Sequence, residues 1–295
     1  MTLRGVYVPL VTPFAADGRV ALDAVDRLAH EYLDAGAAGL VPLGTTGESP
    51  ALDVAEQRAV VDVCAAVATE RGAQLIVGAG TNSTRTTIAA VERFADVPGL
   101  SAVLCVVPYY VRPNQAGIVA HYRAIAERSP VPVIAYNIPY RTGRALEADA
   151  LLEVAGIPNM AGVKQAVGSL DGDTLRVLAE APPDFTLLGG EDPYLFPTVL
   201  LGGGGAICAS AHLCTDRFVA MIECGLAGKV EEGRAHHETL LPVVAAGFAE
   251  PNPAVFKGVL HAQGRIPTPD LRLPMTAASP AAVDRALGAV EAAAR

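Results

Sequence analysis

The stretch Ala161-Gly162-Val163-Lys164-Gln165 is a short apolar run with a lysine near its end. Asn159 and Gly168 bound the run, and this pattern predicts an interior β-strand. Burial disfavours the ammonium form of a lysine and lowers its pKa, so Lys164 can present a neutral amine near pH 7 and attack a carbonyl carbon. The alternative is a lysine whose amine reaches solvent or neutralises a nearby carboxylate.

Similar short runs recur along the chain and alternate with amphipathic segments, such as 22–34, 54–70 and 86–94. Alternating βα units give parallel strands joined by right-handed crossovers, and eight such units close into a barrel. We therefore expect a (β/α)8 TIM barrel over residues 1–228. A doubly wound sheet is the alternative, but no GxGxxG phosphate fingerprint follows the first strand. The strand candidates are 6–11, 39–43, 75–79, 102–107, 131–136, 162–165, 186–188 and 206–209.

The last part of the chain predicts only helices, at 230–248, at 253–262 and in a final helix that Ser279 caps. We expect residues 229–295 to form a C-terminal helical extension packed on the barrel, with Pro242 kinking or ending its first helix.

Helix starts inside the barrel carry capping signals. Asp53 and Glu56 form a possible capping box. Asn114 and Ser169 are the expected N-caps of the helices that follow strands four and six.

Composition and charge predict a folded protein that acts on a small solute. Hydrophobic residues make up 51% of the chain and charged residues 18%, which excludes general disorder. The net charge of −9 argues against a nucleic-acid partner or an anionic membrane surface. The longest uncharged run, 193–215, could span a bilayer by length, but Pro197, the glycines 202–205 and His212 favour a helix, a turn and a strand.

Cysteine and histidine usage predicts neither disulfides nor a metal site. Five cysteines without a CxxC pair are typical of a reduced, cytoplasmic compartment, and we expect them to be small core residues. The six histidines show no HxH or HExxH spacing, and His236 and His237 point to different sides of a helix. The glycines 202–205 lack the lysine of a P-loop, so they favour a tight start of strand eight. We expect no metal and no cofactor.

Polar residues follow several strands at their carboxyl ends, where the active sites of barrels collect. The second strand leads into Gly44–Glu48, the fourth into Pro108-Tyr109-Tyr110, and the fifth into Tyr136–Gly143. Main-chain N–H groups and the Thr45 and Thr46 hydroxyls can hold a small carboxylate beside the amine. An ordinary tight turn would have a similar sequence.

Aromatic and basic side chains at these ends have two interpretations each. The Tyr136 phenol can move protons during carbinolamine formation and dehydration, or it only packs at the rim. Tyr109 and Tyr110 can cover the barrel or reach another subunit. The planar guanidinium of Arg141 can bind a second carboxylate, and the alternative is that Arg141 forms a surface ion pair.

Taken together, these segments resemble the dihydrodipicolinate synthase and N-acetylneuraminate lyase family of class I aldolases. The matching segments keep their order and spacing over essentially the whole chain. They are Gly44 to Glu48, Pro108 to Tyr110, Tyr136 to Gly143, Gly162 to Gln165, and Asn252-Pro253 before Lys257.

The resemblance implies a Schiff base between Lys164 and pyruvate. It implies that Tyr136, Thr45 and Tyr110 relay protons, and that Tyr110 reaches into the site of a neighbouring subunit. Members are commonly homotetramers built as dimers of dimers, so we expect a homo-oligomer. Further expected contacts with substrate are Thr46, which would bind the pyruvate carboxylate, and Gly47, Gly190 and Ile207.

Arg141 matches the synthase pattern, which implies condensation of pyruvate with aspartate semialdehyde to 4-hydroxy-tetrahydrodipicolinate. Two departures stand against a full match. The loop Gly189-Gly190-Glu191-Asp192 is not the usual synthase version, and Glu191 could face another substrate. Lysine-inhibited members carry histidines and a glutamate at three positions where this chain has Val54, Gln57 and Thr86, although Asn82 and Tyr109 match.

Other functions remain open from the sequence. One alternative is an aldolase for a 2-keto-3-deoxy sugar acid or sialic acid, and another is a barrel that binds a keto acid without turning it over. Of the other two lysines, Lys229 is expected at a solvated helix end. Lys257 is expected in a helix of the extension, away from the strand ends.

Overall fold

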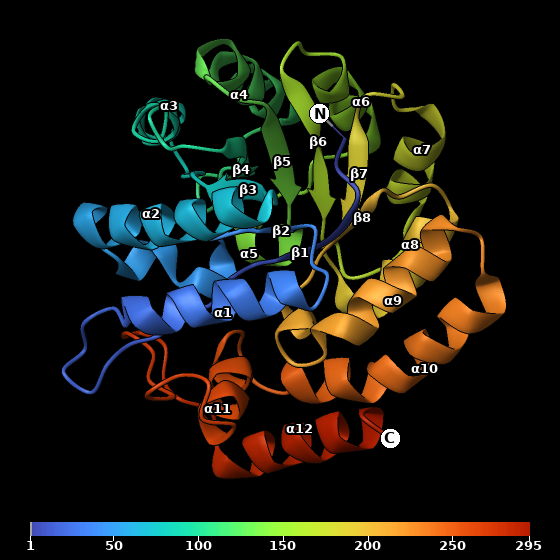
Figure 1. Ribbon diagram of the computed structural model, residues 1–295. Helices are drawn as coiled ribbons and strands as arrows, with labels where there is room; N and C mark the ends of the chain where they lie inside the picture. Colours follow the sequence, from blue (N-terminus) through green and yellow to red (C-terminus); the bar gives the residue numbers. More distant parts are fainter. Residues whose placement is uncertain (1) are drawn as a thin grey trace.

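The computed structural model describes residues 2–295 and confirms a closed barrel of eight parallel strands in sequence order, each paired with its chain neighbours and β1 with β8 (Figure 1). The strands are β1 (Gly5–Val8), β2 (Gly39–Leu40), β3 (Gln74–Gly78), β4 (Leu100–Val106), β5 (Val133–Asn137), β6 (Met160–Gln165), β7 (Thr186–Gly189) and β8 (Gly205–Ile207).

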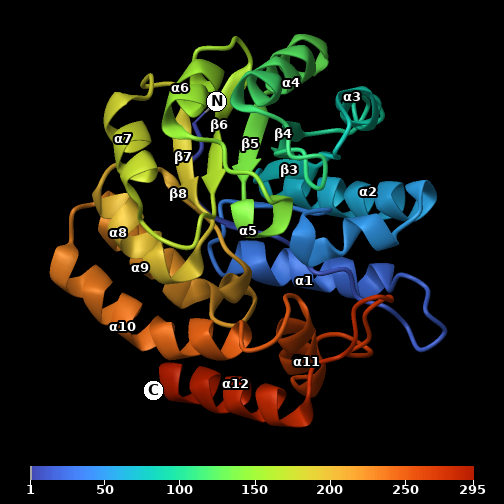
Figure 2. The same cartoon turned by 180° about the vertical axis from the view of Figure 1, so that it is seen from behind.

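Helices follow the strands and form an outer ring, which Figure 2 shows from the opposite side. The α-helices are α1 (Leu22–Asp34), α2 (Val54–Arg71), α3 (Thr84–Glu92), α4 (Gln115–Arg128), α5 (Pro139–Thr142), α6 (Ala148–Ala155), α7 (Gly172–Glu180), α8 (Leu195–Leu200), α9 (Thr215–Leu226), α10 (Val230–Gly247), α11 (Ala254–Ala262) and α12 (Pro280–Ala293). The 3-10 turns are η1 (Thr45–Gly47), η2 (Ser49–Ala51), η3 (Asp192–Tyr194) and η4 (Ala209–His212).

Two hydrophobic clusters account for this arrangement. One fills the barrel interior and includes Tyr7, Val41, Ile76 and Leu188, while a larger one lies between the strands and the helices. Successive strand residues point to opposite faces, so each strand feeds both clusters. The predicted tight start of strand eight is confirmed, because a Cβ on Gly205 would lie 2.0 Å from the carbonyl oxygen of Gly5.

Several predicted bounds were wrong by a few residues. β1 and β2 end at Val8 and Leu40, earlier than predicted, because Pro9 and Pro42 have no N–H to donate to the ladder. The other strands agree with the predicted ones to within two residues at each end.

The predicted caps were correct at two of three barrel helices. Asp53 and Glu56 form a complete capping box, and the Asn114 side chain accepts from Gly117 N at 2.8 Å. Ser169 is not a cap. The helix after β6, α7, starts at Gly172, and its N-cap is Asp171, whose carboxylate accepts from both the backbone N–H and the hydroxyl of Thr174. Asp171 therefore satisfies more donors than the earlier serine would.

The helical extension is confirmed and packs on one side of the barrel, where α10 contacts α9 and α12 (Figures 1 and 2). Ser279 caps α12 as predicted, with its hydroxyl accepting from Ala282 N. Pro242 does not end α10, which continues to Gly247. Within residues 2–295, none of the helices combines the length and apolarity that a membrane crossing requires.

Candidate active site

A cavity of about 410 Å³ opens at the carboxyl ends of the strands. Its wall comes from the segments after β2, β3, β4 and β5, together with two segments of the helical extension. The barrel therefore brings together residues that lie more than 200 positions apart in sequence. The residues that line it include Thr45, Tyr109, Tyr136, Arg141 and Asn252.

Lys164 and Tyr136 lie side by side because they are register partners on β6 and β5. The Lys164 Nζ is 4.4 Å from the centroid of the Tyr136 ring, and the lysine is only 7% exposed. Tyr136 lines the cavity, and the Lys164 amine lies against its ring, just behind the lining residues. The predicted interior strand with a buried lysine is confirmed.

Burial sets the protonation of both groups. It lowers the pKa of Lys164 to about 8, against a smaller opposing effect of the nearby Asp192 carboxylate. Burial raises the pKa of Tyr136 to about 12, and an interaction with the Thr45 side chain partly offsets this. Near neutral pH the site therefore holds a protonated phenol beside an amine that releases its proton far more readily than an exposed lysine.

Gly190 and Asp192 border the lysine from the loop after β7. A Cβ on Gly190 would lie 2.8 Å from Lys164 Cγ and Cε, so a larger residue there would displace the lysine side chain. Asp192 is buried and accepts from Ser210 N at 2.8 Å, and burial raises the pKa of its carboxyl to about 6. Sequence analysis did not predict that this carboxylate is buried, and its only signal was the place of Asp192 after strand seven. Ile207 lies fully buried in the barrel interior.

The loop after β2 is held from two directions. Thr45, Thr46 and Gly47 form the turn η1, and Thr12 Oγ1 donates to Gly47 O at 2.7 Å. Asn252, from the segment before α11, donates from Nδ2 to Thr46 Oγ1 at 3.0 Å. Thr46 is buried.

The expected place of Lys257 away from the strand ends was wrong. Lys257 lies on α11, but its Nζ donates to Glu48 Oε1 at 2.8 Å and to Thr12 O at 2.9 Å. Lys257 is fully buried, and Glu48 belongs to the loop that follows β2. Two acceptors hold the Lys257 amine, and the lower rank of Lys257 as a nucleophile stays a prediction.

Arg141 and Tyr109 lie at the rim of the cavity, while Tyr110 lies outside it. The Arg141 guanidinium stacks 5.1 Å from the Tyr140 ring centroid, and its Nε donates to Tyr140 Oη at 3.2 Å. Within the described chain, no carboxylate forms a salt bridge with Arg141, so the surface ion pair considered from the sequence is absent there. Tyr110 is 87% exposed.

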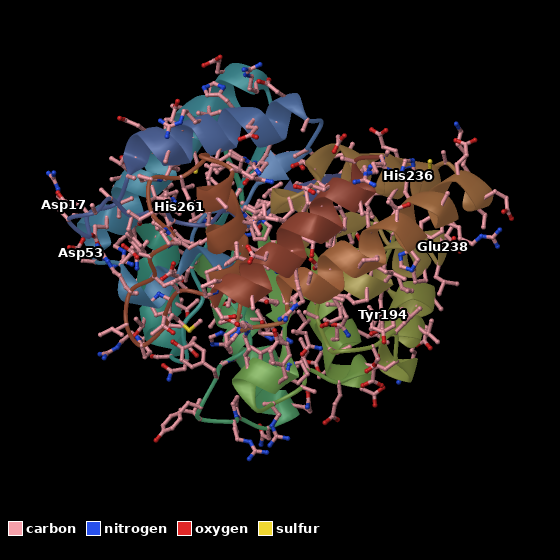
Figure 3. All side chains as sticks on the ribbon, turned by 90° about the horizontal axis from the view of Figure 1, so that it is seen from below. Asp17, Asp53, Tyr194, His236, Glu238 and His261 are labelled. Atoms are coloured by element: carbon pink, nitrogen blue, oxygen red, sulfur yellow. The ribbon has the colours of Figure 1, made fainter. Side chains whose placement is uncertain are left out.

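The histidines are dispersed over the molecule. Figure 3 shows His236 on α10 and His261 on α11 at well-separated places. Across residues 2–295, no group of three or more potential ligands among His, Cys, Asp and Glu comes together. Four cysteines are buried, as predicted, and Cys224 is half-buried.

Comparison with known proteins identifies the family. The model of the dihydrodipicolinate synthetase family matches residues 2–293. The chain is 40% identical over 274 residues to the 4-hydroxy-tetrahydrodipicolinate synthase of Moorella thermoacetica, a match that covers 93% of this chain and 92% of that protein.

Solved structures agree in fold over the full length. The dihydrodipicolinate synthase of Thermotoga maritima superposes with a TM-score of 0.95 at 32% identity, covering 100% of this chain and 99% of that one. The enzyme of Acinetobacter baumannii, solved in complex with pyruvate, gives a TM-score of 0.95 at 31% identity and covers 99% of both chains. This chain belongs to the dihydrodipicolinate synthetase family.

Proposed function

We propose that this chain condenses pyruvate with aspartate semialdehyde to give 4-hydroxy-tetrahydrodipicolinate. The observation that carries the proposal is the buried Lys164 amine, with its lowered pKa, against the Tyr136 ring in the wall of the cavity. Relatives at about 40% identity bear the name of this synthase, and one matching structure is described with pyruvate bound.

In the first half-reaction the neutral Lys164 amine attacks C2 of pyruvate and forms a carbinolamine. Loss of one water gives the imine, and loss of a proton from C3 gives the enamine. The Tyr136 phenol is protonated at neutral pH and lies beside the amine, so it can donate the proton that leaves with water. Thr45 and Tyr110 complete the proposed proton path, and Thr46 and Gly47 hold the pyruvate carboxylate.

In the second half-reaction the enamine carbon attacks the aldehyde carbon of aspartate semialdehyde and forms a carbon–carbon bond. The substrate amine then adds to the imine carbon and displaces Lys164, which closes the ring and regenerates the enzyme. The whole sequence releases one water. Arg141 lies at the exposed rim with its guanidinium stacked on Tyr140, so we assign it to the carboxylate of the aldehyde.

The exposed Tyr110 supports a homotetramer in which this residue enters a neighbouring subunit's site. The residue is 87% exposed and its φ is +70°, a conformation that a bulky residue seldom adopts without a contact that holds it. Sedimentation of the full chain tests the assembly. A matching structure described as a monomeric variant makes a monomer the informative alternative. The free cysteines favour the cytoplasm as the place of action.

A direct assay tests the reaction. The purified chain is incubated with pyruvate and either aspartate semialdehyde or a panel of sugar aldehydes, and product formation is followed. We expect turnover with aspartate semialdehyde and little with sugar aldehydes. Preferential turnover of a sugar aldehyde would replace the synthase by a sugar-acid aldolase, and no turnover with any aldehyde would favour a barrel that only binds.

A further inference from the structure

Asn252 makes a contact with the active-site loop that the proposed mechanism does not use. Asn252 lies between α10 and α11. Its side-chain Nδ2 donates to Thr46 Oγ1 at 3.0 Å, although the two residues are 206 positions apart in sequence. Its Oδ1 is buried and has no hydrogen-bond partner among residues 2–295. A buried amide oxygen without a partner is costly, and this side chain has capacity for one further hydrogen bond from a donor.

The direction of this hydrogen bond determines what the Thr46 hydroxyl can do. A hydroxyl has a single hydrogen, and an amide nitrogen can only donate. Because Thr46 Oγ1 accepts from Asn252, its own hydrogen is free to point elsewhere. Within the described chain the Thr46 hydroxyl donates to no other residue. It is therefore available as a donor to an anionic ligand.

Buried charges hold the two segments together. Glu48, two residues after Thr46, accepts from Lys257 Nζ at 2.8 Å and from Arg272 N at 3.0 Å. The exposure of the Lys257 and Glu48 side chains is 0% and 4%. Asn252 lies two residues before α11, the helix that carries Lys257, so the ion pair helps to hold the segment of Asn252 against the loop.

We propose that Asn252 is a positioning residue for pyruvate: it accepts no proton and touches no reacting atom, but it keeps the Thr46 hydroxyl turned outward as a donor to the pyruvate carboxylate. This inference rests on the proposed function, because it assumes that the ligand in the site is pyruvate. Its failure can be told apart from failure of that function by one experiment.

The experiment measures borohydride trapping of pyruvate on Lys164 in the full chain, at increasing pyruvate concentrations. The variants are Asn252→Asp, Thr46→Val and the double variant. Asn252→Asp keeps the shape of the side chain, but the carboxylate accepts a hydrogen bond where the amide nitrogen donated one. The Thr46 hydroxyl would therefore turn toward the carboxylate and donate to it. We expect the pyruvate concentration for half-maximal trapping to rise about tenfold or more, while the rate at saturating pyruvate stays within about threefold.

The double variant separates hydrogen-bond direction from added charge. If Asn252 acts through Thr46, Asn252→Asp should have little further effect in the Thr46→Val background. An equal weakening in both backgrounds would show a plain charge effect and overturn the proposal, as would unchanged pyruvate dependence in Asn252→Asp. Gln263→Glu, the same chemical change at an exposed site of the extension, is the control and should leave trapping unchanged.

Three outcomes separate failure of this inference from failure of the proposed function. Should Asn252→Asp fail to fold, Asn252→Leu replaces it in the same cycle, and additivity with Thr46→Val would overturn the proposal. Should the unmodified chain trap no pyruvate, the proposed function itself fails, and this inference with it. If the unmodified chain and Asn252→Asp trap pyruvate with the same concentration dependence, only the role of Asn252 is overturned and the proposed function stands.

Discussion

The three lysines of this chain differ in their surroundings more than in their chemistry. Lys229 is exposed and pairs with Glu232 at 3.3 Å, and Lys257 is buried but pairs with Glu48. Among the residues described, Lys164 alone is a buried lysine without a carboxylate within salt-bridge distance. Burial without a close counter-ion favours the neutral amine, and this is the property that imine formation needs.

The rate of imine formation should therefore depend on pH. The pKa of Lys164 is about 8, so the reactive neutral amine is the minor form below that pH and the major form above it. We expect the rate of borohydride trapping at saturating pyruvate to rise from pH 6.5 to pH 9 with a midpoint near 8. A midpoint near the ordinary lysine value would show that burial does not activate this amine.

Substitutions at Tyr136 and Arg141 should separate the two half-reactions. Tyr136→Phe removes the proton donor beside the amine and should slow turnover by about two to four orders of magnitude.

Arg141→Ala should raise KM for aspartate semialdehyde by about tenfold or more and leave pyruvate trapping unchanged. Wild-type kinetics in either variant would contradict the role given to that residue.

The elements of the barrel were predictable because they depend on local sequence, whereas their contacts were not. Apolar runs and the Asp53–Glu56 pattern located strands and helices correctly. Ser169 was wrongly chosen as an N-cap because two suitable residues lie close together, and sequence alone does not show which one reaches the helix N–H groups. Sequence analysis also did not predict the hydrogen bonds that η4 makes. Its His212 accepts from Val11 N at 3.2 Å, beyond β1, and its Nδ1 lies 2.7 Å from Ala209 O.

The His212 contact predicts acid sensitivity. Val11 N–H needs an acceptor at Nε2, so the folded ring must be neutral, and burial lowers the pKa of His212 to about 4. Unfolding restores a pKa near 6.5, so stability is full above that pH and falls as the pH drops from 6.5 toward 4, by roughly 3 kcal/mol at most.

Urea unfolding at pH 7.5 and pH 5 measures this loss. His212→Asn, which cannot titrate, should lose less stability between the two pH values than the unmodified chain does. Equal losses in both chains would place the acid sensitivity elsewhere.

At the scale of the whole molecule, the helical extension is part of the site and not an appendage. The Lys257–Glu48 pair and the Asn252–Thr46 hydrogen bond join residues 209 and 206 positions apart. No periodicity or spacing rule predicts a specific pair at such a separation, which is why Lys257 was misplaced from the sequence. The motif resemblance marked both segments, but only the fold shows that they touch.

Breaking this connection should destabilise the chain. Glu48→Gln leaves the fully buried Lys257 ammonium without its counter-charge, so we expect a loss of about 3–5 kcal/mol in the free energy of unfolding. Asp17→Asn, at an exposed carboxylate that pairs with Arg19, is the matched control and should leave the free energy of unfolding nearly unchanged. Similar losses in both variants would contradict a special role for the buried pair.

Regulation by lysine should be absent. The family resemblance implies that this chain departs from lysine-inhibited members at Val54, Gln57 and Thr86, and the Gln57 side-chain nitrogen donates to the carbonyls of Ser49 and Leu52. We expect millimolar L-lysine to leave turnover unchanged. Inhibition at such concentrations would show that another set of residues binds this effector.

The most direct test of the central claim is peptide mapping after reduction of the chain with borohydride in the presence of pyruvate. The account predicts one modified peptide, with the reduced adduct on Lys164, and no adduct in Lys164→Ala. An adduct on Lys257 or Lys229, or no adduct at all, would contradict it.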